Sequence, residues 1–211
     1  MSGYADRYFY PGTATLINHF GIKDPEELER VEAFYSRLAL RQPILPAIEF
    51  TSDGLKQIHH HFFHQIYPWG EFRTVDMVKL LEPGQPPVRF APGAHIARVE
   101  MPRFCGELRY DVEVGRSFER LDRKTFGYRA AVYMADLNHI HPFPEGNGRT
   151  QRILLDHMAA RAGFRLHHGR IVRDAWLAAT IDSVGQDSRG GQFTPHVKMT
   201  ELIAEAVEPA A

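Results

Sequence analysis

The chain has 211 residues, of which 44% are hydrophobic and 24% charged, with a formal net charge of -1. This composition predicts a globular protein with a sizeable core, and we expect a single domain over residues 1–211. A near-neutral charge gives no overall field that would hold nucleic acid or an anionic membrane. We therefore expect no direct nucleic-acid partner and no membrane partner.

Cys105 is the only cysteine of the sequence, so no internal disulfide is possible and a reducing compartment is expected. Residues 1–12 lack the basic and apolar regions of a secretory signal. No stretch of the sequence approaches the roughly 20 apolar residues that span a bilayer. These features predict a cytoplasmic protein.

The first quarter of the sequence predicts an irregular N-terminal cover followed by two helices. Residues 1–23 are rich in aromatic side chains and are interrupted by proline and glycine, which leaves room for at most one short helix. Asp24, followed by a proline and two glutamates, predicts a helix over 25–40. Thr51 is a second capping residue, and the apolar spacing after it predicts a helix that ends near residue 67.

Residues 71–96 change to the alternating pattern of strands. Residues 72–78 alternate between apolar and polar side chains, and a segment rich in proline and glycine over 83–87 precedes a second short run, Val88 to Phe90. We predict a β-hairpin flap with a long tip over 71–96.

Two long central helices are expected over 117–162. Ser117 is the predicted cap of the first, which continues to about residue 140, and the second covers 149–162. The loop between them carries residues 141–152, called the motif segment below. Further helices are expected over 176–184 and 200–207.

The motif segment reads His-Pro-Phe-Pro-Glu-Gly-Asn-Gly-Arg-Thr-Gln-Arg. Gly146 and Gly148 allow the backbone to pass close to a ligand, and the helix that follows offers unpaired N–H groups and a positive dipole end. Arg149 and Arg152 lie three residues apart on one helical face, so both can reach the same phosphates. The segment therefore predicts an anion site for a phosphorylated ligand.

Two further side chains of the segment suit phosphate chemistry. Glu145 offers the single carboxylate by which Mg²⁺ is commonly held beside substrate phosphates. His141 could remove a proton from an attacking hydroxyl near neutral pH. A glycine turn or a histidine alone is usually structural, but their combination favours a site. The two commoner phosphate loops do not fit, because the sequence lacks both Gly-x4-Gly-Lys-Ser/Thr and the third glycine of a dinucleotide fold.

At every specified position the segment matches His-x-Phe-x-(Asp/Glu)-Gly-Asn-Gly-Arg-x-x-Arg, so the chain resembles the Fic family. Residues 67–75 are similar to the stretch that leads into the flap of that family. Residues 10–13 resemble the start of bacterial Fic toxins and effector Fic domains. The family commonly has Ala-Gly after the tryptophan of this stretch, whereas Gly70 directly follows Trp69 here, which leaves the flap geometry and the choice of target open.

The resemblance implies a mainly α-helical Fic fold, a helical bundle with a β-hairpin flap beside the active-site loop. It also implies transfer of AMP from ATP to a Ser, Thr or Tyr hydroxyl of a target protein, with Mg²⁺ as cofactor. By match to the motif, His141 would be the general base and Glu145 the Mg²⁺ ligand. The expected ATP-binding residues are Gly146, Asn147, Gly148, Arg149 and Arg152.

The flap is expected to bind the target by strand addition, because an exposed hairpin edge offers unpaired main-chain groups at fixed spacing. The residues expected to take part are Thr74, Val75, Asp76, Met77, Val78 and Lys79.

Many Fic proteins carry an inhibitory helix, Ser/Thr-x-x-x-Glu-Gly/Asn, whose glutamate pairs with the second arginine of the motif, here Arg152. No Ser or Thr of the sequence is followed four residues later by Glu, and Thr200 comes nearest, with Glu205 one position late. The resemblance therefore favours a toxin that a small antitoxin protein inhibits in trans. The alternatives are an effector domain that modifies a host protein, an enzyme that removes AMP, and a regulatory module that binds nucleotide without transfer.

Other noticeable side chains have ordinary interpretations. His60 and His64 are four residues apart and could bind zinc, but no glutamate accompanies them, which favours an ordinary helix face. Cys105 shows no sign of activation and is expected to be structural. Trp176 is expected in the core, although residues 174–187 resemble the region that closes the adenine pocket of the family.

Overall fold

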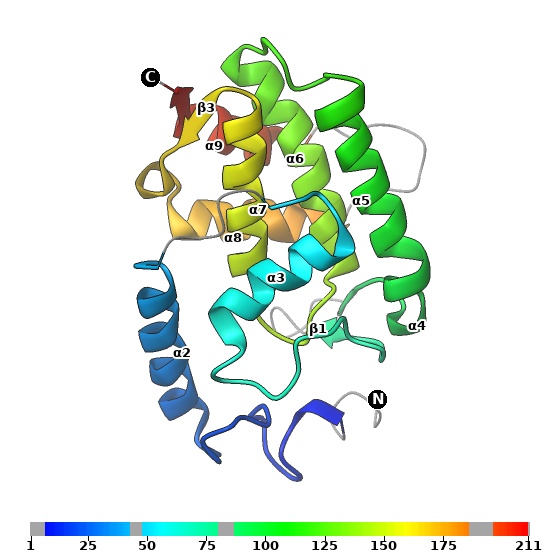
Figure 1. Ribbon diagram of the computed structural model, residues 1–211. Helices are drawn as coiled ribbons and strands as arrows, with labels where there is room; N and C mark the ends of the chain where they lie inside the picture. The colour runs from blue at the N-terminus through cyan, green and yellow to red at the C-terminus, as the bar shows by residue number, and fades with distance from the viewer. Residues whose placement is uncertain (1–6, 43–47, 80–86, 186–195, 211) are drawn as a thin grey trace.

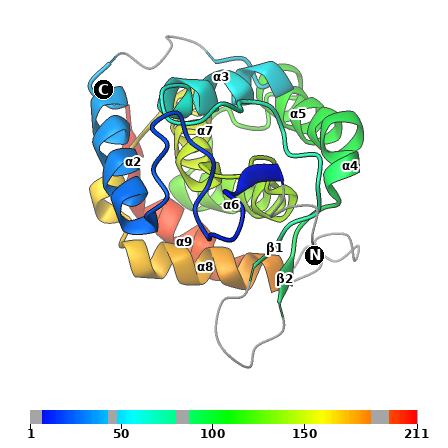
Figure 2. The ribbon, with the colours of Figure 1, turned by 90° about the horizontal axis from the view of Figure 1, so that it is seen from below.

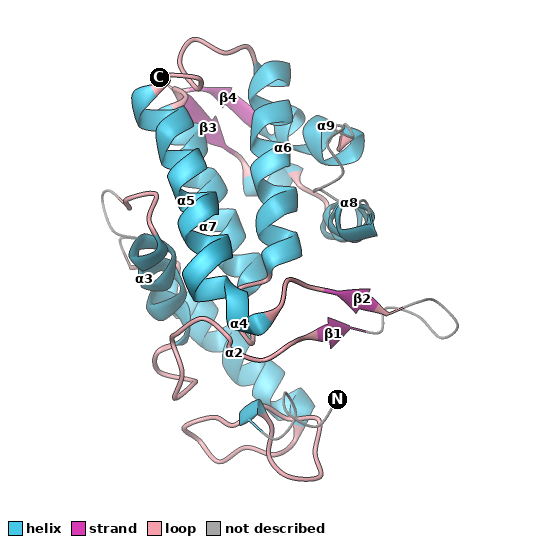
Figure 3. Ribbon diagram, turned by 90° about the vertical axis from the view of Figure 1, so that its right-hand side faces the viewer, coloured by secondary structure: helices cyan, strands magenta, loops and turns pink. Residues whose placement is uncertain are grey.

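A computed structural model describes residues 7–42, 48–79, 87–185 and 196–210. Its centre is a pair of helices, α6 (Arg123–Ile140) and α7 (Asn147–Arg161), with α5 (Met101–Arg109) along the same direction (Figures 1 and 3). The predicted mainly α-helical fold is confirmed. The surrounding helices are α2 (Pro25–Ala39), α3 (Ser52–Phe63), α8 (Arg173–Gly185) and α9 (Val197–Ala206).

Apolar side chains from these helices form a common core. Helix α6 is buried on most of its circumference, as is typical of a helix enclosed by others. Cys105 belongs to this core, and burial raises the pKa of its thiol to about 11, which keeps it protonated and unreactive. Large side chains that are almost fully buried include Leu55, Phe63, Phe104, Phe126, Met134, Leu154 and Met158.

Helices α2 and α3 begin where the capping residues predict. Asp24 Oδ1 accepts a hydrogen bond from the Glu27 N–H at 2.7 Å, and Thr51 Oγ1 accepts one from the Gly54 N–H at 3.1 Å. Helix α3 ends at Phe63 and turns follow it, so the predicted extension to residue 67 is wrong.

The first central helix begins later than expected. Asp122, not Ser117, caps α6, because its Oδ1 accepts hydrogen bonds from the N–H groups of Lys124 and Thr125, both at 2.9 Å. Residues 117–120 form turns instead.

A helical stretch over 93–114 was not expected, and the predicted extension of the hairpin to residue 96 is wrong. It consists of α4 (Gly93–His95), a π-helical turn (Ile96–Glu100), α5 and a second π-helical turn (Tyr110–Val114). Pro102 lacks the N–H that would continue the α-helical ladder, which accounts for the wider turn just before it.

The flap contains a shorter hairpin than predicted. Strand β1 (Val78–Lys79) pairs antiparallel with β2 (Val88–Arg89), and the hairpin projects from the helices beside α8 (Figures 2 and 3). The predicted strand over 72–78 is wrong, because residues 72–77 pair with no other described strand and instead bury Phe72, Arg73 and Met77. The predicted tip over 83–87 lies largely outside the described residues.

A second antiparallel pair was not predicted. Strand β3 (Phe164–Leu166) follows α7, and β4 (Val207–Pro209) follows α9. A 3₁₀ turn (His168–Arg170) leads from β3 to α8. The pair fixes the end of the chain against the end of α7, which sets the course of α8 past the motif segment.

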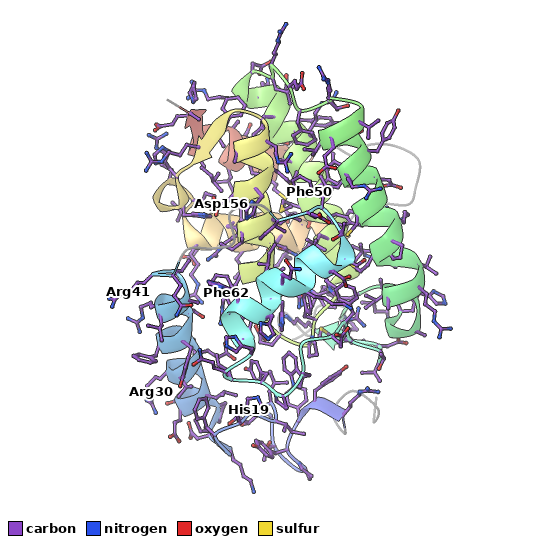
Figure 4. The ribbon with its side chains drawn as sticks, viewed as in Figure 1. His19, Arg30, Arg41, Phe50, Phe62 and Asp156 are labelled. Atoms are coloured by element: carbon purple, nitrogen blue, oxygen red, sulfur yellow. The ribbon has the colours of Figure 1, made fainter. Side chains whose placement is uncertain are left out.

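The expected N-terminal cover over 1–23 stays a prediction, and residues 1–6 lie outside the described part of the chain. Residues 13–20 form bends, a bridge from Leu16 to Phe9 and a turn, without a helix. Tyr8 packs edge-on against Trp69, with ring centroids 5.9 Å apart, and the His19 N–H donates to the Ile66 carbonyl at 2.8 Å. In Figure 4, Arg30 of α2 and Arg41, which follows the end of that helix, lie on the outer side of α2, whereas Phe62 of α3 lies on its inner side. Among the described residues, no helix is long and apolar enough to cross a membrane.

Candidate active site

The motif segment spans the junction of the two central helices. Only residues 141–146 form a loop, because α7 already begins at Asn147. Gly146 caps α7 with a positive φ of 85°, and a Cβ on it would lie 2.3 Å from the Phe63 ring. Both the backbone conformation and the space at this position therefore require glycine.

The side chain of Asn147 closes the loop on itself. Its Oδ1 accepts the Phe143 N–H at 2.9 Å, and its Nδ2 donates to the Phe143 carbonyl at 2.7 Å. Because both polar atoms are used and the residue is 4% exposed, its amide shapes the loop. Its main-chain N–H lies in the first turn of α7, where helix N–H groups lack partners.

His141 ends α6 in a left-handed conformation, with φ 48° and ψ 62°. Its ring stacks on Phe90 at 4.1 Å between centroids, and Lys79 Nζ lies 3.3 Å from its Nε2. An ammonium group can only donate, so Nε2 must accept and the imidazole is neutral. Burial, Lys79 and Arg73 hold the pKa of His141 well below 6.5, which is the protonation state that a general base needs.

Arg149 points toward α2 and is already paired. Its Nη2 donates to Glu32 Oε2 at 2.5 Å, its Nη1 donates to Ser36 Oγ at 2.8 Å, and the guanidinium lies over the Phe63 ring. The Tyr67 hydroxyl donates to the other oxygen of Glu32, and burial and this carboxylate raise the pKa of Tyr67. Sequence reasoning missed Glu32, which looks like one more glutamate of an exposed helix.

Arg152 is a free cation between two cavities. It has no ion pair or hydrogen bond with another described residue, and burial, Arg149 and Arg173 lower its pKa. It lines a cavity of about 670 Å³ that also borders Glu145, and a cavity of about 290 Å³ that borders His141. The residues common to both cavities are Gly148, Arg152, Arg173 and Trp176.

Helix α8 supplies the far wall of these cavities. Trp176 is 5% exposed, as the predicted core position requires, yet its ring borders both spaces. Arg173, in the first turn of α8, was not expected to take part in the site. It became recognisable only because the fold brings Arg173 to the same two cavities as Gly148 and Arg152 of α7.

Glu145 is held at the mouth of the site. Its Oε1 accepts the Gly146 N–H at 2.8 Å, and its carbonyl oxygen lies 3.1 Å from His59 Nε2. His59 stacks between Phe63 and Phe143, and burial lowers the pKa of His59 to about 4, so this neutral ring supports the loop. His60 and His64 are both exposed, and their rings stack on each other with centroids 4.5 Å apart.

The expected flap residues divide into two groups. Met77, Val78 and Lys79 line a third cavity of about 490 Å³, which Glu145 and Arg149 also border. Thr74, Val75 and Asp76 lie at the root of the hairpin, where Asp76 Oδ1 accepts the Gly93 N–H at 2.8 Å.

The profile of the Fic/DOC family matches residues 49–159, which contain α3, the flap, α5, α6 and most of α7. The chain belongs to this family. The matched residues include the whole motif segment.

Curated relatives cover most of this Fic chain. It is 33% identical over 184 residues to the protein adenylyltransferase VbhT of Bartonella schoenbuchensis, which covers 86% of this chain and 36% of VbhT. It is 30% identical over 207 residues to Fic of Escherichia coli K12, described as a probable protein adenylyltransferase, with 96% and 94% covered. The chain thus spans about a third of VbhT and nearly all of the E. coli protein.

Solved structures of Fic proteins share the fold. BepC, a VirB-translocated effector of Bartonella tribocorum with bound AMPPNP, is 25% identical, with a TM-score of 0.78 and 97% of each chain covered. An N-terminal Fic domain from Bartonella quintana with bound ADP is 28% identical, with a TM-score of 0.78, covering 97% of this chain and 96% of that one.

Proposed function

We propose that this chain transfers AMP from ATP to a hydroxyl group of a protein. The observation that carries the proposal is the cavity that places His141, with an accepting Nε2, beside Gly148 and the unpaired Arg152. A base and a cationic anion site around one space are what hydroxyl attack on a phosphate requires. The names of the relatives, protein adenylyltransferases, support the same chemistry.

The proposed step forms one bond and breaks one. The hydroxyl oxygen attacks the α-phosphorus of ATP, and its proton moves to Nε2 of His141. The bond from the α-phosphorus to the oxygen bridging to the β-phosphate breaks, and pyrophosphate leaves. We expect Arg152 and the first N–H groups of α7 to stabilise the negative charge on the departing phosphates, because Gly148 and Arg152 border the same cavity.

The residues present fit a magnesium ion held jointly with the nucleotide. Glu145 faces two cavities, and no cluster of three or more acidic, histidine or cysteine side chains that could hold a metal occurs among the described residues. One carboxylate plus substrate phosphates is the usual arrangement for Mg²⁺, which when bound would neutralise phosphate charge. We therefore assign Glu145 as its protein ligand.

The target segment is proposed to lie along β1. The cavity beside Met77, Val78 and Lys79 follows this strand on the side where Glu145 and Arg149 lie. An extended peptide paired there by main-chain hydrogen bonds would bring a hydroxyl toward His141 with little demand on its sequence. Docking of the target in this way would displace Lys79 Nζ from Nε2 of His141.

The test compares ATP labelled at the α-phosphate with ATP labelled at the γ-phosphate, using bacterial lysate proteins as acceptors. Only the α-label should become protein-bound, and His141→Ala should abolish the incorporation while ATP binding stays within about twofold. His64→Ala, which changes an exposed histidine that borders none of the three cavities, is the matched control and should transfer normally. Transfer of the γ-label, or retained transfer by His141→Ala, would contradict the proposal.

We also propose that a partner protein inhibits the chain in trans. The 211 residues lack the inhibitory pattern, and Arg152 has no acidic partner among the described residues. A glutamate supplied by a small antitoxin could occupy this place. Expression of the chain in bacteria should arrest growth, and expression of His141→Ala should not. Strong transfer activity with normal growth would favour the alternative of a host-directed effector, which the Bartonella neighbours resemble.

A further inference from the structure

Arg73 is the largest fully buried charged side chain of the described residues, at 0% exposure. Four hydrogen bonds of its guanidinium go to main-chain carbonyls. Nε donates to His141 at 2.7 Å, Nη1 donates to Val75 at 2.7 Å, and Nη2 donates to Ala91 at 2.7 Å and to Ile140 at 3.0 Å. Burial of a guanidinium carries a large desolvation penalty, which these four acceptors offset. A buried arginine with so many main-chain partners therefore indicates a specific role in the structure.

The four carbonyls belong to two separate parts of the active site. Ile140 and His141 are the end of α6, where the proposed base lies. Val75 precedes β1 and Ala91 follows β2, so these two residues are the roots of the flap hairpin. One planar side chain thus connects both roots of the flap to the residue that carries the base.

Main-chain hydrogen bonds repeat the same connection. The Arg73 N–H donates to the Pro142 carbonyl at 2.8 Å, and the Ala91 N–H donates to the His139 carbonyl at 3.1 Å. The two roots also touch, since a Cβ on Gly93 would lie 2.4 Å from the Val75 nitrogen. Main-chain hydrogen bonds therefore join the flap roots to the end of α6 on both sides of the guanidinium.

His141 needs such support because its backbone is left-handed, with φ 48°, a conformation that a non-glycine residue keeps only when its surroundings determine it. The carbonyl of His141 is itself an acceptor of Arg73 Nε. Movement of the flap roots would therefore be transmitted to the backbone that aims the imidazole.

We propose that Arg73 is a positioning residue that joins the flap and His141 into one unit, so that a target docked on the flap meets Nε2 at a fixed distance. This inference rests on the proposed function, in which the flap holds the target. It assigns to Arg73 no contact with ATP or with the reacting atoms. Misplacement of a reacting group by about 1 Å can reduce a rate about 100-fold, which is why one linking side chain could matter so much.

Arg73→Lys is the decisive variant, because lysine keeps the charge and the aliphatic stem but cannot donate in the fixed fork of a guanidinium. We expect the initial rate of AMP incorporation into lysate protein at saturating ATP to fall about 10- to 100-fold, with the KM for ATP within about twofold. Arg103→Lys is the matched control, since Arg103 pairs with Glu107 of α5 and Asp136 of α6 and borders none of the three cavities, and it should keep the wild-type rate.

Hydrogen exchange supplies a readout that does not depend on activity. The main-chain amides of residue 73 and Ala91 should exchange faster in Arg73→Lys than in wild type, while amides in the middle of α7 stay protected. Unchanged exchange at both positions, or an unchanged rate, would overturn the inference. A parallel loss of rate, ATP binding and melting temperature would also overturn it, by showing a general structural role. If wild-type protein transfers no AMP, the proposed function fails, and the exchange data still decide whether Arg73 couples the two parts.

Discussion

The ion pair of Glu32 and Arg149 predicts that one substitution lowers the stability of the chain and raises its affinity for ATP. The side chains of Glu32 and Arg149 are 11% and 31% exposed, and Nη2 lies 2.5 Å from Oε2. Glu32→Gln keeps the volume but removes the charge, and Tyr67 keeps an oxygen to which it can donate.

A hydrogen bond between charged groups contributes about 1.5–3 kcal/mol. Because Arg149 is partly exposed and can recover solvation, we expect Glu32→Gln to lower the free energy of unfolding by about 1–2 kcal/mol. For a protein of this size about 1 kcal/mol corresponds to about 2–4 °C, so the melting temperature should fall by about 2–8 °C.

The same change should strengthen ATP binding. In the free chain a phosphate must compete with Glu32 for the Arg149 guanidinium, and the variant removes that competitor and its negative charge. We expect the Kd for ATP to fall about three- to tenfold, which corresponds to about 0.6–1.4 kcal/mol.

Thermal denaturation and isothermal titration calorimetry measure the two quantities. Glu29→Gln is the control, because Glu29 is an exposed glutamate on the same helix and should change neither. If Glu32→Gln weakened ATP binding, Glu32 would orient Arg149 for phosphate and would not compete with it. An unchanged melting temperature would show that the pair adds nothing to stability.

Three further variants test the site. The depressed pKa of His141 keeps the imidazole neutral below pH 6.5, so the transfer rate of the wild type should begin to fall only well below pH 6.5. Lys79→Met should shift this acid limb of the pH–rate profile to higher pH, because Lys79 lowers the pKa of His141. An unshifted limb would show that the charge of Lys79 does not lower that pKa. Gly146→Ala should destabilise the chain by about 1–3 kcal/mol in urea unfolding, because the new methyl group meets Phe63 and φ is positive; an unchanged midpoint would contradict this geometry. Glu145→Ala should raise the magnesium concentration needed for half-maximal transfer at least about tenfold, and an identical magnesium titration would exclude Glu145 as the ligand.

Local signals in the sequence predicted some elements well. The caps Asp24 and Thr51 place the starts of α2 and α3 because a cap needs only the N–H groups two or three residues away. The stretch over 93–114 escaped prediction because Pro102 and π-helical turns interrupt its pattern, and exposed apolar side chains blur its amphipathic face. The hairpin was overestimated because residues 72–77 alternate in sequence, yet the buried Arg73 ties them to α6.

That residues 1–211 form a single domain stays a prediction, as do the roles of the individual site residues. The motif segment identified the family from sequence alone, because a contiguous loop and helix start carry most of an anion site in twelve successive residues.

Only the tertiary structure shows which distant residues contact the motif segment. Glu32 reaches Arg149, Arg73 reaches His141, and Arg173 approaches Arg152 from positions far away in the chain. None of these residues stands out locally, since each is a charged residue in an unremarkable setting of its own. Their importance arises from burial and from the crossing of helices, which fix side-chain distances and the local field, and these are properties of the packed chain.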